Sequence, residues 1–115
     1  MKNEQKKITL IVNELLTLLL HHGASDINIQ ITKKDHYISV NFIQKDCDFD
    51  TDLVDKLKFE LKAQRQNEVE GYYWQLVGKA SRGDELHLVG AMIDESTITL
   101  EDNVLTIYLK RVCLD

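Results

Sequence analysis

The sequence predicts an α/β protein of the α+β kind, folded as a two-layer sandwich with helices packed on one face of a mixed, mainly antiparallel sheet. Two kinds of apolar spacing support this prediction, because some segments repeat every three or four residues and others alternate. Short polar connections between the alternating segments favour local strand pairing. With 115 residues, the chain has room for one such domain, residues 1–115, and hardly for two.

The first predicted helix follows a charged lead-in and ends near His22. Gly23 is suited to a left-handed cap, and His21 and His22 lie in the last turn, where positive charge suits the helix dipole. Glu14 and Leu18 line up with His21 on one flank. The inward stripe consists of residues spaced three or four apart: Ile8, Ile11, Val12, Leu15, Leu16 and Leu19.

Two alternating segments come next and predict a hairpin. Residues 26–32 and 36–44 carry apolar side chains at every second position, as in strands with one buried face, and residues 33–35 form the turn. The helix before them is expected to pack on the same face of the sheet. The apolar positions of the two strands are Ile27, Ile29 and Ile31, and Ile38, Val40 and Phe42.

The second half of the chain predicts further helices and a closing pair of strands. Thr51 can cap a helix that buries leucine and valine side chains as far as residue 61. A helical piece is predicted at 69–78, and a short helix at 85–93 follows a turn at 81–84. The closing strands are predicted at 96–100 and 104–112, joined by Glu101, Asp102 and Asn103.

Composition and charge narrow the class of protein. The hydrophobic share of 43% and the charged share of 29% are typical of a soluble globular protein, and the net charge of −5 argues against nucleic acid as a partner. No apolar run is long enough to insert into a membrane, and no signal peptide precedes the first helix. Cys47 and Cys113 form no disulfide framework. These features indicate a cytoplasmic protein.

The end of the first helix resembles the N box of the histidine-kinase-type ATPases, the family shared by sensor kinases, Hsp90, gyrase and MutL. The family pattern is close to Asn-Glu-Leu-Leu-x-Asn-Ala-x-Lys-His-Gly, and residues 13–17 fit it, as do His22 and Gly23. Leu18 stands where the family has the asparagine that holds Mg²⁺, and His21 stands where lysine is usual.

A second resemblance lies in residues 83–94, which are similar to the second glycine box of sensor kinases. Together the two boxes and the order of elements make the resemblance cover most of residues 8–112. Glycines of the box are replaced at Glu85 and His87. The positions that fit are Gly83, Leu86, Leu88 and Val89.

The first glycine box of the family, Asp-x-Gly-x-Gly, has no intact counterpart. One alignment puts Gln44 at the position of the adenine-binding aspartate and Asp46 and Asp48 at the glycines; the other shifts the box by two, so that Asp46 takes the aspartate position and Asp48 and Asp50 the glycine positions. Either way both glycines are lost and carboxylates face the phosphates. A solvated acidic loop is the plainer interpretation of this segment.

The resemblance implies a sensor-kinase fold whose nucleotide site has decayed, a pseudokinase of two-component signalling that binds a protein partner and no cofactor. The alternative is an active ATP-dependent histidine or serine kinase of this family, which would bind Mg-ATP. It would keep Glu14 as the catalytic residue and contact the cofactor through His21, His22, Gly83 and Leu86. A third hypothesis is metal binding by the acidic loop, although an EF-hand glycine and glutamate are missing there, and no metal site is expected.

Overall fold

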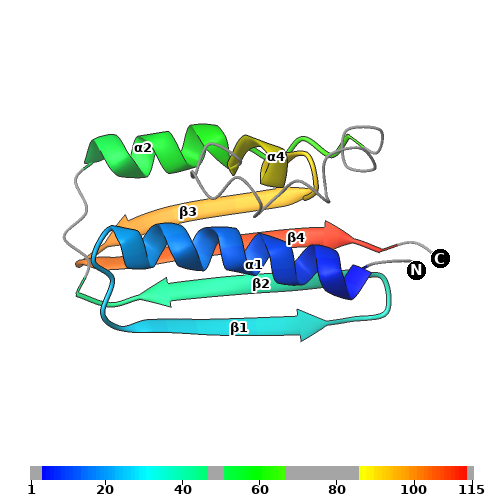
Figure 1. Cartoon of the computed structure of the whole chain (residues 1–115), viewed down its shortest axis with the longest axis horizontal. Helices are drawn as coiled ribbons and strands as arrows, with labels where there is room; N and C mark the ends of the chain where they lie inside the picture. Colours follow the sequence, from blue (N-terminus) through cyan, green and yellow to red (C-terminus); the bar gives the residue numbers. More distant parts are fainter. Residues whose placement is uncertain (1–3, 47–50, 67–85, 114–115) are drawn as a thin grey trace.

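The structure is a computed structural model, and it describes residues 4–46, 51–66 and 86–113. The predicted helical piece at 69–78 and the predicted turn at 81–84 lie outside the described residues. Within them, helices and strands follow one another in this order (Figure 1): α1 (Glu4–His21), β1 (Ile27–Lys33), β2 (Tyr37–Gln44), α2 (Thr51–Glu60), α4 (Leu86–Gly90), β3 (Glu95–Glu101) and β4 (Val104–Val112).

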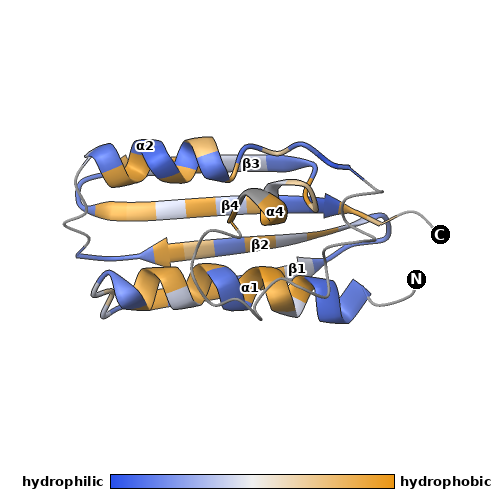
Figure 2. Cartoon of the chain, turned by 45° about the horizontal axis from the view of Figure 1, so that its top comes forward, coloured by the Kyte–Doolittle hydropathy of each residue, from blue (hydrophilic) through white to orange (hydrophobic). Residues whose placement is uncertain are grey.

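The strands form one sheet in the order β1-β2-β4-β3, and each neighbouring pair is antiparallel. The predicted hairpin is confirmed, because Ile29 pairs with Phe42 and Ile31 pairs with Val40. The helices α1, α2 and α4 lie on one side of the sheet (Figures 1 and 2). The two-layer prediction is therefore confirmed, with a sheet that is antiparallel throughout the described strands rather than mixed.

The core lies between the helices and the sheet. Leu15 and Leu19 of α1 are fully buried, and Leu16 packs against the core from a partly buried position. The strands contribute the residues that alternate toward the helices, most of them in β2 and β4: Ile38, Val40, Phe42, Ile98, Leu105, Ile107 and Leu109. The helical stripe and the alternation therefore meet at one interface, as the spacing predicts.

The first helix ends as expected. Gly23 has a φ of 88°, and its N–H donates to the carbonyl of Leu20 (3.0 Å), while the N–H of Ala24 donates to the carbonyl of Leu19 (3.0 Å). This pair of bonds is a Schellman cap, which favours glycine because a side chain is strained at positive φ. The cap turns the chain toward β1.

The turn between β3 and β4 also agrees with the sequence. Asp102 and Asn103 have φ values of 52° and 63°, and Glu101 pairs with Val104 on either side of them. Two residues with positive φ are typical of the type I′ hairpin turn, and Asp and Asn tolerate that conformation.

The predicted helix at 85–93 is too long, since α4 ends at Gly90. The carbonyls of Gly90 and Ala91 accept backbone N–H groups of Gln64 and Gln66 (both 2.9 Å) and do not continue a helix. A Cβ at Gly90 would lie 2.7 Å from the carbonyl oxygen of Lys62. The close approach of the chain after α2 therefore ends α4 at the one residue without a side chain.

The prediction of a buried face on β1 is wrong in part. The strand pairs as expected, but Ile29 and Ile31 are 37% and 52% exposed. They share a face with Phe42 and Val40, their partners on β2, which are both 1% exposed. Since β1 is at the edge of the sheet, the helix layer covers β2 more fully than β1.

Candidate functional site

The residues that resemble the N box lie on the second half of α1 and at its C-terminal cap. Glu14 is buried at 7% exposed, and it has a polar interaction in the structure. Leu18, at the position of the family's magnesium-binding asparagine, is partly buried and packs against the core. This flank of α1 therefore contributes to packing.

The other residues expected at a nucleotide differ in their exposure. His21 and His22 are exposed at the end of α1, with ring centroids 5.4 Å apart in an edge-to-face contact. Leu86 begins α4 and is 3% exposed within the core, while Gly83 lies outside the described residues. The elements α1 and α4, which carry Glu14 and Leu86, contact each other.

Gln44 differs from these residues because it has a buried polar atom without a hydrogen-bond partner among the described residues. At the end of β2, its side chain is 3% exposed, and Oε1 has no hydrogen-bond partner among the described residues. An amide oxygen buried in this way is costly unless something donates to it. Gln44 is also the residue that one alignment places at the adenine-binding position of the family.

The acidic loop is described only at its two ends. Asp46 is exposed with a φ of 54°, and Asp52 is exposed in the first turn of α2, while Asp48 and Asp50 lie outside the described residues. No group of three or more His, Cys, Asp or Glu side chains able to hold a metal occurs in the part of the chain that the structure describes.

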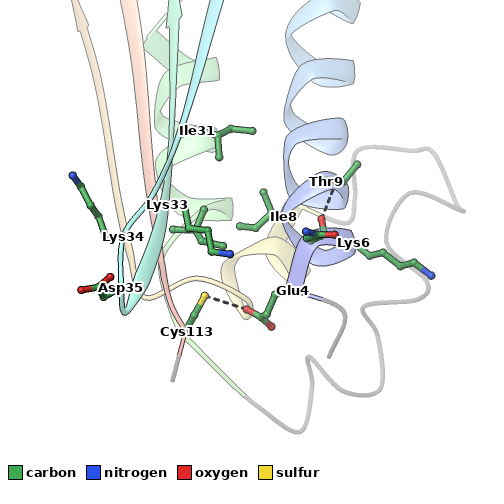
Figure 3. Close-up of a pocket in the computed structure, with 11 residues that line it drawn as sticks. Glu4, Lys6, Ile8, Thr9, Ile31, Lys33, Lys34, Asp35 and Cys113 are labelled. Carbon is green, nitrogen blue, oxygen red and sulfur yellow. Dashed lines mark hydrogen bonds between the residues drawn. The ribbon is translucent and has the colours of Figure 1, made fainter. Parts of the chain in front are cut away.

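An open groove of about 710 Å³ runs between the N-terminal end of α1 and the β1–β2 hairpin. Figure 3 shows Ile8 and Ile31 pointing toward each other across it, whereas Lys34 and Asp35 point away. Its lining combines charged, polar and apolar side chains: Glu4, Gln5, Lys6, Ile8, Thr9, Ile31, Lys33, Lys34, Asp35, Ile38 and Cys113.

Glu4 of α1, which lines this groove, binds Arg111 of β4. Arg111 is 1% exposed, and its Nε and Nη2 donate to the two carboxylate oxygens of Glu4 at 2.9 and 2.8 Å. Nη1 donates to the carbonyl of Met92 at 2.7 Å. This paired geometry satisfies a cation that would otherwise be costly to bury, and it attaches the start of α1 to β4.

Cys113 belongs to the same cluster. Its Sγ donates to Oε1 of Glu4 at 3.2 Å. Burial raises the pKa of the Cys113 thiol, and the hydrogen bond to Glu4 raises it further. The hydrogen bonds from Arg111, opposed by burial, lower the pKa of Glu4. A thiol held protonated beside a carboxylate is a poor nucleophile, so this cluster is suited to structure rather than to catalysis.

The alternation of β4 is a sequence signal for this cluster, although no motif marks it. Arg111 continues the inward alternation of Leu105, Ile107 and Leu109, so the same rule that places the leucines in the core places the arginine there. A buried arginine requires a carboxylate partner. That partner, Glu4, lies in the segment 1–7 that the sequence predicts as a charged lead-in, and this prediction is wrong from residue 4 onward because α1 begins at Glu4.

A second ion pair joins Arg65, which follows α2, to Asp94, which precedes β3. Asp94 accepts from Arg65 Nη1 at 2.8 Å and from the backbone N–H of Val112 at 2.7 Å. Arg65 also donates to the carbonyl of Val112 at 3.1 Å. The chain after α2, the approach to β3 and the end of β4 are therefore fixed together.

Partly buried and exposed apolar side chains also occur on α1 and β1, and we call this set the α1–β1 strip: Val12, Leu16, Leu20, Ile29 and Ile31. Three of its members are exposed, Leu20 at 56%, Ile29 at 37% and Ile31 at 52%. Gln5 and Thr9 line the groove with Ile31, and the residues of the strip on α1 continue their helical flank. Figure 1 shows α1 and β1 running in opposite directions.

No helix among the described residues is long and apolar enough to cross a membrane. No protein-family model matches the sequence, and no curated protein matches it significantly.

Proposed function

We propose that this domain is a histidine-kinase-like module that acts by binding protein in cytoplasmic two-component signalling, with a nucleotide site that no longer functions. One observation carries the proposal, which is the exposed α1–β1 strip beside the free edge of β1. Exposed apolar side chains on most monomeric proteins are scattered, and several of them beside one free sheet edge favour a surface where another molecule binds.

The edge of β1 adds polar specificity to this apolar surface. Among the described strands, β1 pairs only with β2, so the backbone N–H and C=O groups on its outer side have no partner strand. Such an edge accepts an additional strand, whose backbone supplies hydrogen bonds while its side chains contact the apolar strip. A protein segment can supply both the backbone hydrogen bonds and the apolar contacts, whereas a small polar ligand supplies neither a strand nor apolar side chains.

The residues on α1 support loss of the nucleotide site. Leu18 has no oxygen for Mg²⁺, whose octahedral shell needs oxygen ligands, and it packs on the core. Glu14 is buried rather than presented in an open cleft. The carboxylates of Asp46 and Asp48 replace glycines in the alignment with the family, and they would repel phosphates.

One observation favours the active alternative. The buried Oε1 of Gln44 lacks a donor among the described residues, and an adenine amino group is a donor of the required kind. On this alternative the domain keeps an adenine contact and transfers phosphate from Mg-ATP. The defects at Leu18 and in the glycine box oppose it.

Calorimetry with Mg-ATP, Mg-ADP and adenosine distinguishes the two functions. Each lost charged contact weakens binding by about 1–3 kcal/mol, so we expect Mg-ATP to bind with a dissociation constant in the millimolar range or weaker. Leu18→Asn tests whether the missing metal ligand is the main defect, and Leu20→Asn is its control on the same helix. Binding of Mg-ATP tighter than about 100 µM by the unaltered chain would promote the kinase and reject the decayed site.

A further inference from the structure

We infer that the partner at the α1–β1 strip is a second copy of this chain, which adds its own β1 to the free edge in an antiparallel register centred on Gln30. The inference rests on the proposed protein-binding function and names the partner. It uses three features of β1: the direction of its backbone groups, the pattern of its apolar side chains, and the charges at its two ends.

The backbone groups that face outward are known from the pairing with β2. The N–H of Lys34 donates to the carbonyl of Tyr37 (2.8 Å), and the carbonyl of Asp26 accepts from Lys45 (3.0 Å). In an antiparallel pair, alternate residues bond to the neighbouring strand, so the even-numbered residues between these two bond to β2. The odd-numbered residues, including Ile29 and Ile31, therefore turn their N–H and C=O groups to the free edge.

Pairing about Gln30 matches these groups and the apolar side chains at once. It places Ile29 opposite the partner's Ile31, and Ile31 opposite the partner's Ile29, as hydrogen-bonded pairs on the helix-covered side of the sheet. Gln30 lies opposite the partner's Gln30 on the two-fold axis. A register centred on Ile31 would place the exposed Ile29 opposite the partner's Lys33, whereas pairing about Gln30 places the partly buried Ile27 there.

The charges at the ends of β1 favour the same register. Asp26 comes directly before β1 and Lys34 directly after it, and both are exposed. Pairing about Gln30 places Asp26 opposite the partner's Lys34, and the symmetry repeats this pair at the other end. A register centred on Ile29 also matches apolar residues, but it places Asp26 opposite the partner's Thr32 and loses both ion pairs. Complementary cross-strand charges therefore select the centre at Gln30.

The symmetry also brings the apolar strips together. A two-fold axis through a pair of antiparallel edge strands is perpendicular to the sheet, so the helices of both copies lie on the same side of one continuous sheet. The strip of one copy, with Leu16 and Leu20 on α1, then faces the strip of the partner across the joined edge. The apolar side chains that water now contacts become the centre of the interface.

Sedimentation velocity of the full chain tests the partner. A short edge gives a small interface, so we expect a dimer with a dissociation constant on the order of 10 µM. Ile31→Lys introduces charge at the centre of the interface and should weaken the dimer at least tenfold. Because Ile31 is exposed, the variant should keep the monomer fold, which circular dichroism measures. Phe59→Lys is the matched control on α2, where phenylalanine is 79% exposed, and should leave the dimer unchanged. A chain that is monomeric at about 300 µM, or a dimer that Ile31→Lys does not weaken, overturns the inference.

Disulfide trapping tests the register. In a Cys47→Ser background, Gln30→Cys should form a covalent dimer under mild oxidation, because a pair that is not hydrogen-bonded has Cα atoms about 4.5 Å apart, within reach of a disulfide. Asn28→Cys alone should not, although mixed with Thr32→Cys it should form a covalent heterodimer. Efficient homodimers of Asn28→Cys with none of Gln30→Cys would reject the register.

Charge exchange gives an independent measurement. Asp26→Lys or Lys34→Asp alone should weaken the dimer about tenfold, and the double exchange should restore it. Failure of the double exchange to restore the dimer rejects the proposed pairing. These experiments measure association and not nucleotide binding. Tight binding of Mg-ATP would reject the decayed nucleotide site without affecting the dimer. A chain that stays monomeric would reject the dimer without affecting the decayed site.

Discussion

The two edges of the sheet, β1 and β3, show why similar strand patterns end in different environments. Both strands alternate apolar and polar residues, and both are at an edge. Yet Ile98 of β3 is 7% exposed, whereas Ile31 of β1 is 52% exposed. The difference is set by the helix layer, because α2 contacts β3, and none of the described helices contacts β1 to the same extent.

The position of α1 explains the uncovered edge. The bonds between Arg111 and Glu4 attach the start of α1 to β4, and the buried stripe of Ile11, Leu15 and Leu19 forms the core with β2 and β4. With its centre held there, α1 presents only a flank toward β1. Alternation in a sequence thus specifies a strand and its apolar face, while burial of that face depends on where the helices are attached.

The charges at the ends of the two edge strands also differ. β3 begins with Glu95 and ends with Glu101, so antiparallel pairing of two copies about Ile98 would place these like charges opposite each other. Native proteins commonly protect edge strands with such charges. β1 has no charge between Asp26 and Lys33, and its flanking charges are complementary. One edge is therefore protected against pairing, and the other is suited to it.

The largest effect that would break this comparison is expected from Arg111→Ala. Removing one partner of a buried ion pair leaves the other uncompensated, so we expect a loss of about 3–5 kcal/mol in the free energy of unfolding. Lys110→Ala is the control, because Lys110 is next to it in β4 but makes a partly exposed pair with Glu95 at 3.5 Å. Urea titration should show a change of under about 1 kcal/mol for the control. Equal losses would show that Arg111 does not hold α1.

A direct comparison of the two edges comes from Ile98→Ala and Ile31→Ala. The first removes core volume and should cost about 2–4 kcal/mol, while the second removes a largely hydrated side chain and should cost under about 1 kcal/mol. Both are measured by urea titration at low protein concentration, where self-association does not contribute. A cost for Ile31→Ala equal to that for Ile98→Ala would mean that β1 is covered in solution.

Strand pairing, the helix face and both turns could be predicted from the sequence because they follow local rules. Gly23, Asp102 and Asn103 are examples, since each has the positive φ that its residue type tolerates. The exposure of Ile31 could not be predicted in this way, because it depends on the position of α1 relative to the sheet. Arg111 and Glu4 are 107 residues apart in sequence, and nothing in either local pattern names the other as its partner.

The candidate site was less accessible to sequence reasoning than the fold. The motif resemblance directed attention to Glu14, His21 and His22, and the structure separates the buried first residue from the two exposed ones. A free edge is a property of the assembled sheet and has no motif. Only the absence of charge between Asp26 and Lys33 was visible beforehand as a departure from the usual protection of edges.

The smallest effect concerns the pH dependence of the attachment between α1 and β4. The hydrogen bonds from Arg111 lower the pKa of Glu4 below its ordinary value of 4.5. The unfolded chain therefore binds this proton more readily than the folded protein does. The stabilisation is fully present above the unfolded pKa, and it is lost as the pH falls through the lower, folded value.

Glu4→Gln keeps an acceptor for Arg111 but removes the charge, so we expect a loss of about 1–2 kcal/mol near pH 7. The variant should also lose less stability than the unaltered chain between about pH 5 and pH 3, so that the two curves converge in acid. Urea titrations across this range measure both effects, with Glu101→Gln at the exposed β3–β4 turn as the control. Curves that stay parallel would show that the charge of Glu4 does not hold α1, and the uncovered edge of β1 would then need another cause.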